Sequence, residues 1–185
     1  AMSLAAPAQA KPGGGAPLLA EGVSTPPAAA ARALSRHALH LLDGRDASLA
    51  GMAGQVVVFN FWATWCRPCL RELPALQQLN TEIVPRGARV LAVSIDQDRR
   101  NVERFAHAHA LTLPVAHDGP DGLARELDLK QVPLTLVLDR SGAVAYCSSR
   151  TDAARLAETR AAVLRLLAAP ATPAPLAGES AGETP

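Results

Sequence analysis

Residues 59–74 read FNFWATWCRPCLRELP, a stretch in which an apolar segment runs into two closely spaced cysteines. The segment from Gln55 to Phe61 is almost continuously apolar and rich in β-branched residues, which predicts a strand buried on both faces. From Cys66 to about Ile83 the leucines recur at helical spacing, which predicts a helix with one apolar side. The cysteine pair is therefore expected where a buried strand passes into a helix.

Cys66 and Cys69 stand at the predicted start of that helix. Disulfide exchange needs two sulfurs that can close a small ring, one of which is a thiolate near neutral pH. Because free N–H groups at a helix N-terminus favour an anion, Cys66 is predicted to be the attacking nucleophile. Cys69, one turn further on and more buried, is predicted to resolve the mixed disulfide. Arg67 adds positive charge beside the thiolate, and Pro68 is well tolerated in a first helical turn.

Other interpretations of the pair need further features. A zinc site needs two more ligands, and Cys147 and the histidines give no second pair with matching spacing. A structural disulfide across two residues would close too small a loop to stabilise much. The Pro-x-x-x-Thr-x-x-Cys motif expected of a peroxiredoxin is absent. A copper-binding assembly module stays open as an alternative, although the only methionines are Met2 and Met52.

Composition narrows the class of protein and partner. With 185 residues and 49% hydrophobic composition, the chain can bury the core of one domain. The net charge of +1 and the 3% aromatic content give no reason to expect nucleic acid as a partner. The sequence has no run of about 18 apolar residues, the length that a bilayer-spanning helix requires.

The two ends of the chain differ in composition from its middle. Residues 1–33 carry five prolines, a triple glycine and only three charges, which predicts a disordered segment or linker. Residues 170–185 carry four prolines and are predicted to be a disordered tail, which leaves 34–169 as the folded domain. Ala8-Gln9-Ala10 fits the small-x-small pattern of a signal-peptidase site, so we expect the remnant of an export signal.

Strand and helix signals alternate within the predicted domain. Because the turn at residues 140–142 is so short, the two strands that it joins must be antiparallel. A parallel half joined to an antiparallel hairpin, with helices on both faces, is the α/β thioredoxin architecture. Strands are predicted at 37–42, 55–61, 89–95, 134–138 and 143–147, helices at 66–83, 98–110 and 122–127, and a last helix capped by Thr151.

The stretch 59–74 resembles the active-site block of the TlpA/ResA-like thioredoxin family, and the resemblance extends over roughly residues 36–168. Members are exported bacterial thiol–disulfide oxidoreductases, commonly reductants in cytochrome c maturation or oxidase assembly. The resemblance implies a periplasmic or otherwise exported monomer that reduces protein disulfides and receives electrons from a membrane or soluble thiol donor. It implies no metal or organic cofactor. Oxidase or isomerase activity on the same fold is the alternative.

Further positions carry the resemblance outside the cysteine pair. Asn60 stands where thioredoxin has a buried aspartate, and Glu72 matches the active-site acid of ResA-like members. The match implies that Glu72 moves a proton to or from the resolving sulfur, whereas the residue alone would suggest a solvated helix charge. Val132-Pro133 resembles the cis-proline pair that faces the disulfide and exposes the Val132 backbone to an extended substrate. Gln131 departs from the glycine that the family often has there.

The remaining candidates receive simpler predictions. Trp62 is expected in the core, and Trp65 on an apolar rim that receives the partner. Cys147 is expected to be a buried small hydrophobe rather than a third redox thiol. Solvated surface positions are expected for His107, His109 and His117.

Overall fold

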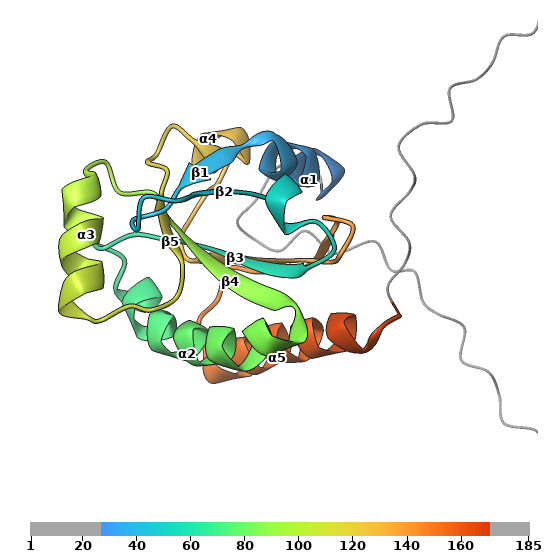
Figure 1. The fold of residues 1–185 in the computed structure, drawn as a ribbon. Coiled ribbons are helices and arrows are strands. Elements are labelled where there is room, and N and C mark those ends of the chain that lie inside the picture. The colour runs from blue at the N-terminus through green and yellow to red at the C-terminus, as the bar shows by residue number, and fades with distance from the viewer. Residues whose placement is uncertain (1–26, 171–185) are drawn as a thin grey trace, which may run out of the picture.

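A mixed sheet of five strands forms the centre of the molecule in the computed structural model, which describes residues 27–170 (Figure 1). In spatial order the strands are β5 (Val115–His117), β4 (Ala88–Ser94), β3 (Val56–Trp62), β6 (Leu134–Leu138) and β7 (Val144–Ser148). The first three run parallel, and β6 and β7 are antiparallel to their neighbours. The predicted α/β thioredoxin fold is thereby confirmed.

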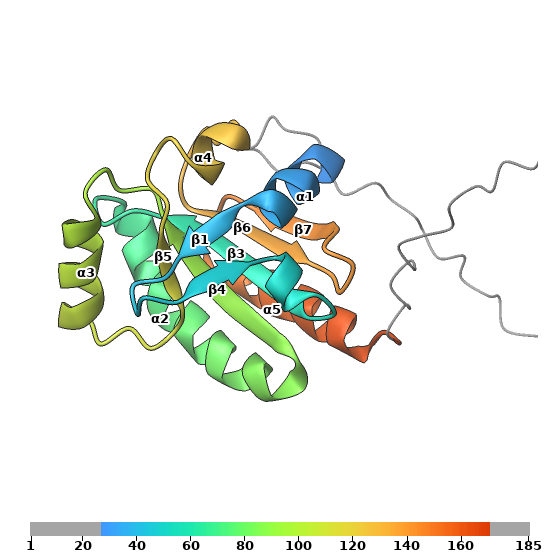
Figure 2. The same cartoon turned by 45° about the horizontal axis from the view of Figure 1, so that its top comes forward.

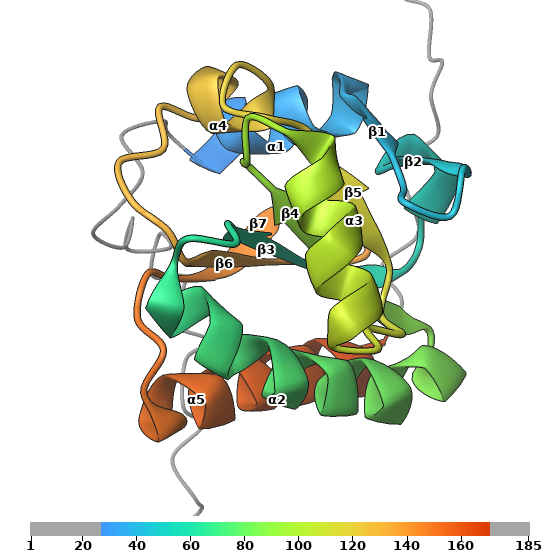
Figure 3. The same ribbon diagram turned by 90° about the vertical axis from the view of Figure 1, so that its left-hand side faces the viewer.

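Helices lie on both faces of the sheet, which Figure 3 shows end on. One face carries α2 (Arg67–Ile83) and α5 (Ala153–Ala168). The other carries α1 (Pro27–Arg36), α4 (Leu123–Glu126) and the hairpin of β1 (Ala38–His40) and β2 (Asp46–Ser48). The remaining elements are α3 (Arg99–Ala108), beside β5, and the 3-10 turns η1 (Ala50–Met52) and η2 (Val84–Arg86).

Strand β3 separates two hydrophobic cores because successive side chains of a strand point to opposite faces. Val57 and Phe59 pack under α1 and the β1–β2 hairpin, whereas Val58 and Trp62 pack against α2. Every residue of β3 is buried. A strand buried on both faces has no polar side to pattern, which explains the continuous apolar run in the sequence.

The N-terminal boundary corrects the sequence prediction. Residues 27–33 were expected to be linker, but they form the first turns of α1. Ala30 and Leu34 on this helix are 3% and 1% exposed. Alanine favours helix strongly, and its small side chain lets the helix approach the sheet closely. Residues 1–26 and 171–185, including the export signal expected at 8–10, lie outside the described residues, so those predictions stay predictions.

Two short strands and one cap also differ from expectation. Strands β2 and β5 have three residues each, and β5 is fixed by parallel pairing to β4 rather than by a pattern of its own. Figure 2 shows β1 passing beside β5, where the Leu42 N–H donates to the Val115 carbonyl. The cap of α5 is Asp152, which accepts the Arg155 N–H, and not Thr151. Within residues 27–170, no helix has the length and apolar character needed to cross a bilayer.

We predict that Arg140→Ala destabilises the fold by about 1–2 kcal/mol. The Arg140 guanidinium donates to the carbonyls of Leu166 and Ala169 at 2.8 and 3.0 Å, and so satisfies the C-terminus of α5. Urea unfolding measures the loss. Arg104→Ala, which removes an exposed arginine from α3, is the matched control and should cost less than about 0.5 kcal/mol. Equal losses in both variants would contradict the prediction.

Candidate active site

The site lies where α2 begins, at the carboxyl end of β3. The loop of Ala63, Thr64 and Trp65 leads from the strand to Cys66, which is the N-cap residue of α2. The Cys66 sulfur accepts the N–H of Cys69 at 3.3 Å. This places the first sulfur at the positive end of the helix dipole, as the sequence predicted.

Cys66 and Cys69 form a disulfide with a Cα–Cα distance of 5.3 Å. Cys66 is 5% exposed and Cys69 is 1% exposed. Both residues are buried, and the cysteine at the helix start is the slightly more exposed of the two. Trp65, directly before it, is 66% exposed and is one of two large hydrophobic side chains that are exposed within residues 27–170.

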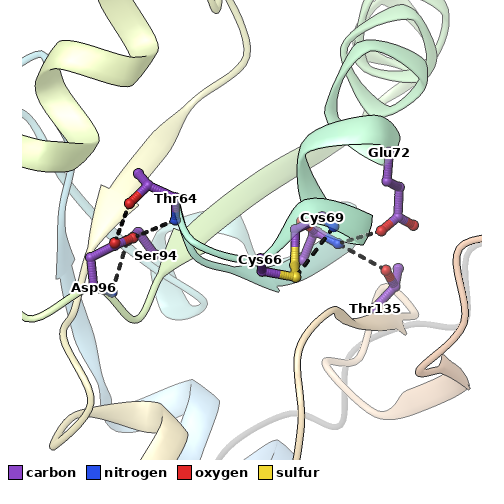
Figure 4. Close-up of a disulfide and its surroundings, with 8 residues drawn as sticks. Thr64, Cys66, Cys69, Glu72, Ser94, Asp96 and Thr135 are labelled. Atoms are coloured by element: carbon purple, nitrogen blue, oxygen red, sulfur yellow. Dashed lines mark hydrogen bonds between the residues drawn. A yellow bond between two sulfur atoms is a disulfide. The ribbon is translucent and has the colours of Figure 1, made fainter.

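Glu72 of α2 and Thr135 of β6 lie on one side of the disulfide (Figure 4). They form a buried polar cluster with Asn60 of β3. The Asn60 amide donates to Thr135 Oγ1 at 3.0 Å and to Glu72 Oε2 at 3.4 Å. Glu72 is 3% exposed, so the solvated helix charge that the residue alone suggested is wrong. Burial raises the pKa of Glu72 to about 7, although the hydrogen bonds from Asn60 and Thr135 act in the opposite direction.

A second polar cluster lies on the other side of the disulfide and was missed by sequence reasoning (Figure 4). Asp96 is 2% exposed, and its carboxylate accepts hydrogen bonds from Thr64 and from Ser94. The signal that could have found it is the position of an acid two residues beyond a buried strand. The carboxyl ends of adjacent parallel strands lie at one edge of the sheet, where such residues meet.

The loop before β6 also reaches the site. The Val132–Pro133 peptide bond is cis, as expected. Val132 and Trp65 line one pocket of about 390 Å³, together with Ile95 from the end of β4. The remaining lining residues come from the α4 segment and the loop that follows it: Pro120, Asp121, Ala124, Arg125, Asp128, Leu129, Lys130 and Gln131.

The other sequence candidates fall in different places. Arg67 and Pro68 are exposed in the first turn of α2, and Trp62 is fully buried, 5.4 Å from the ring of Phe105. His107 and His109 are exposed as expected. His117 is not a solvated surface residue, because it is half-buried and its Nε2 lies 2.7 Å from the Asp96 carbonyl oxygen. Within residues 27–170, no three His, Cys, Asp or Glu side chains are grouped so that they could hold a metal ion.

Comparison with known proteins connects this geometry to a family. A model of the AhpC/TSA family matches residues 30–147. The thiol-disulfide oxidoreductase ResA of Geobacillus thermodenitrificans is 36% identical over 103 residues, which are 56% of this chain and 59% of that protein. The thioredoxin-like protein YneN of Bacillus subtilis is 36% identical over 109 residues, or 57% of this chain and 63% of that one. The chain thus spans about three fifths of the length of these curated relatives.

Solved structures give the same result. A thiol:disulfide interchange protein of the thioredoxin family from Chlorobium tepidum superposes with a TM-score of 0.63 at 25% identity, covering 71% of this chain and 92% of that one. A secreted thiol-disulfide isomerase from Corynebacterium glutamicum superposes with a TM-score of 0.63 at 26% identity, covering 72% and 84%. The resemblance to ResA-like proteins that the sequence suggested is confirmed.

We predict that Glu72 makes the protein less stable as the pH rises. The folded pKa of about 7 lies above the ordinary value of 4.5, so between these values the folded state binds more protons than the unfolded state. The free energy of unfolding should therefore fall by up to about 3 kcal/mol as the pH rises from 4.5 to above 7. Glu72→Gln should remove this part of the pH dependence.

Urea unfolding of the oxidised protein at pH 4.5 and pH 8 measures the effect. Glu103→Gln, an exposed glutamate on α3, serves as the matched control and should keep the wild-type pH dependence. If Glu72→Gln and wild type lost the same stability over this range, burial of Glu72 would not be the cause.

Proposed function

The chain belongs to the AhpC/TSA family, and from this premise we propose that it is a thiol–disulfide oxidoreductase that acts on protein disulfides through Cys66 and Cys69. The observation that carries the proposal is the place of the disulfide. Its first sulfur caps α2 and accepts the Cys69 N–H at 3.3 Å. A thiolate released at that position is stabilised by the helix N-terminus, which makes Cys66 a nucleophile near neutral pH.

The reduced protein acts in two exchange steps. The Cys66 thiolate attacks one sulfur of a substrate disulfide, forms a mixed disulfide and releases the other substrate sulfur as a thiolate, which takes up a proton. Cys69 then loses its proton and attacks the Cys66 sulfur, which frees the second substrate thiol and forms the Cys66–Cys69 disulfide. The substrate gains two electrons. A thiol donor then supplies two electrons to the protein in a further exchange, which restores the Cys66–Cys69 dithiol.

The assignment of roles follows the difference in exposure. Cys69 is 1% exposed, whereas Cys66 is 5% exposed and follows the exposed Trp65, so we assign the attack to Cys66 and the resolution to Cys69. The pocket lined by Trp65, Ile95 and Val132 also carries charged residues of the α4 segment, and we propose that a substrate segment rests there, beside the residue that precedes Cys66. Backbone groups of Val132 are then available to pair with that segment in extended form.

Glu72 is proposed to carry the proton of the second step. It lies on α2 one turn beyond Cys69, is buried, and has a pKa raised to about 7 by burial. A carboxyl group with a pKa near the working pH can both accept the proton of the resolving thiol and return it. Asn60 orients the carboxyl by donating to Oε2 at 3.4 Å.

The direction of electron transfer, the cellular location and the partners are proposed from the relatives. We propose a reductase, with oxidase or isomerase activity as the alternative, that is exported and takes electrons from a membrane or soluble thiol donor. A secreted protein is among the structural relatives, and two relatives are 36% identical. A copper-binding assembly role is the second class, and copper titration of the reduced protein distinguishes it from exchange activity.

We predict that Cys66→Ser abolishes disulfide exchange and that Cys69→Ser accumulates a mixed disulfide with the substrate, because resolution is lost while attack remains. Non-reducing gels and mass spectrometry detect the trapped species. Cys147→Ala is the control, since this half-buried residue of β7 lies outside the disulfide, and it should retain wild-type activity. Trapping by the Cys66 variant instead would reverse the two roles.

We predict that Arg67→Ala lowers the reduction potential by only about 20 mV, because an exposed charge contributes little to a neighbouring thiolate. Loss of the positive charge disfavours the thiolate and therefore the reduced form. Equilibration with glutathione at several ratios measures the potential. Arg71→Ala, an exposed arginine one turn further along α2, is the matched control. A shift on the order of 100 mV for Arg67→Ala would mean that the dipeptide between the cysteines sets the direction of the enzyme.

A further inference from the structure

A buried carboxylate holds the loop that delivers Cys66 to the helix (Figure 4). Asp96 Oδ2 accepts the backbone N–H of Thr64 at 3.0 Å, and Asp96 Oδ1 accepts the Thr64 hydroxyl at 2.5 Å. The same acid thus binds the backbone and the side chain of one residue, two positions before Cys66. Two hydrogen bonds to one carboxylate fix both the place and the orientation of that residue.

The sheet determines that these two residues meet. Trp62 at the end of β3 pairs with Ser94 at the end of β4, and the Ile95 N–H donates to the Trp62 carbonyl at 2.9 Å. Thr64 and Asp96 each lie two residues beyond this pair. The contact between Thr64 and Asp96 is therefore positioned by the last residue pair of two parallel strands.

Asp96 is itself held from two strands. The Ser94 hydroxyl donates to Asp96 Oδ2 at 2.7 Å, and the Asp96 N–H donates to Ser94 Oγ at 3.1 Å. The Asp96 carbonyl oxygen lies 2.7 Å from Nε2 of His117 on β5, and because a carbonyl only accepts, Nε2 carries the hydrogen. Strands β4 and β5 together prevent the acid from following the loop if the loop moves.

We propose that Asp96 is a positioning residue for disulfide exchange, which acts through Thr64 to fix the Cys66 sulfur opposite Cys69. The Cys66 N–H donates to the Ala63 carbonyl at 3.1 Å, so Thr64 lies inside a tight turn that ends at the reactive residue. With Thr64 anchored, little freedom is left between β3 and Cys66. This inference rests on the proposed function and adds to it a residue that touches neither sulfur.

Anchoring Thr64 raises the effective concentration of the Cys66 sulfur at the Cys69 sulfur. Forming the disulfide in the folded protein costs less entropy when Cys66 is already placed. Loosening the turn should therefore weaken the disulfide relative to the dithiol. A purely structural role would lower the stability of the oxidised and reduced forms equally, and by the thermodynamic cycle it would leave the reduction potential unchanged.

The test uses Thr64→Val and Asp96→Asn in the full chain. Thr64→Val removes the hydroxyl without changing charge or shape, and Asp96→Asn replaces one of the two acceptor oxygens at the other end of the contact by an NH2 donor. In each variant we expect the equilibrium constant for disulfide formation against glutathione to fall threefold to tenfold. A tenfold fall is a rise of about 30 mV in the potential of this two-electron couple. The pH dependence of Cys66 alkylation, measured in parallel, corrects for any change in thiolate fraction.

Thr159→Val is the matched control. Thr159 is a buried threonine, whereas Thr64 is half-buried, and the Thr159 hydroxyl donates to the Arg155 carbonyl within α5, away from the loop. This variant should lose stability but keep the wild-type equilibrium constant. If Asp96→Asn does not fold, Thr64→Val alone decides.

Two outcomes overturn the inference. One is a corrected equilibrium constant for Thr64→Val within twofold of wild type, and the other is a shift of the same size in Thr159→Val. The proposed function fails separately, because it fails if the wild-type Cys66–Cys69 pair does not exchange with glutathione at all.

Discussion

Seven residue pairs join β3 to β4 in parallel, from Val56 with Ala88 to Trp62 with Ser94. This pairing brings the carboxyl ends of two buried strands to one edge of the sheet. From that edge β3 continues into the loop and helix that carry the cysteines, and β4 continues into Asp96. The site therefore depends on backbone hydrogen bonds between strands that carry neither sulfur, in a sheet whose central strand has no exposed residue.

The disulfide lies between two buried polar clusters that act differently. Glu72, Asn60 and Thr135 surround a carboxyl whose pKa is raised to about 7 by burial, so this side can store or release a proton. Asp96 and Thr64 make close, direct hydrogen bonds, so the other side restrains the backbone. Buried polar groups are costly when unsatisfied, and here each cluster gives its members partners within the fold.

The surface around the pair combines a nearly covered disulfide with an exposed apolar side chain. Trp65 protrudes beside a disulfide that is itself nearly covered, and the adjacent pocket of about 390 Å³ is bounded by Val132. An apolar side chain that stays exposed next to a reactive group lowers the desolvation cost of partner binding. Helix α5 lies outside the matched family segment of residues 30–147, but its Val163 completes the core under α2.

The sequence by itself determined β3, α2 and the redox pair. Their signals are local: a continuous apolar run, leucines at helical spacing, and two cysteines at a helix start. The cis bond before Pro133 and the exposure of Trp65 were also predicted, because the resemblance and the position beside the pair pointed to them.

Only the tertiary structure decided the rest. The alanine-rich α1 has only Arg32 and Arg36 to mark its polar side, and β2 and β5 are too short to show a period. These elements form because α1 packs on the sheet, β2 pairs with β1 and β5 pairs with β4. From the sequence alone, Glu72 would be taken for a solvated charge on a helix, and Asp96 for an acidic residue of a surface loop. The role of such a group depends on the residues that pack over it, because they decide whether the group is solvated, titrates near neutrality or anchors the backbone. Those residues come from strands that are distant in the chain.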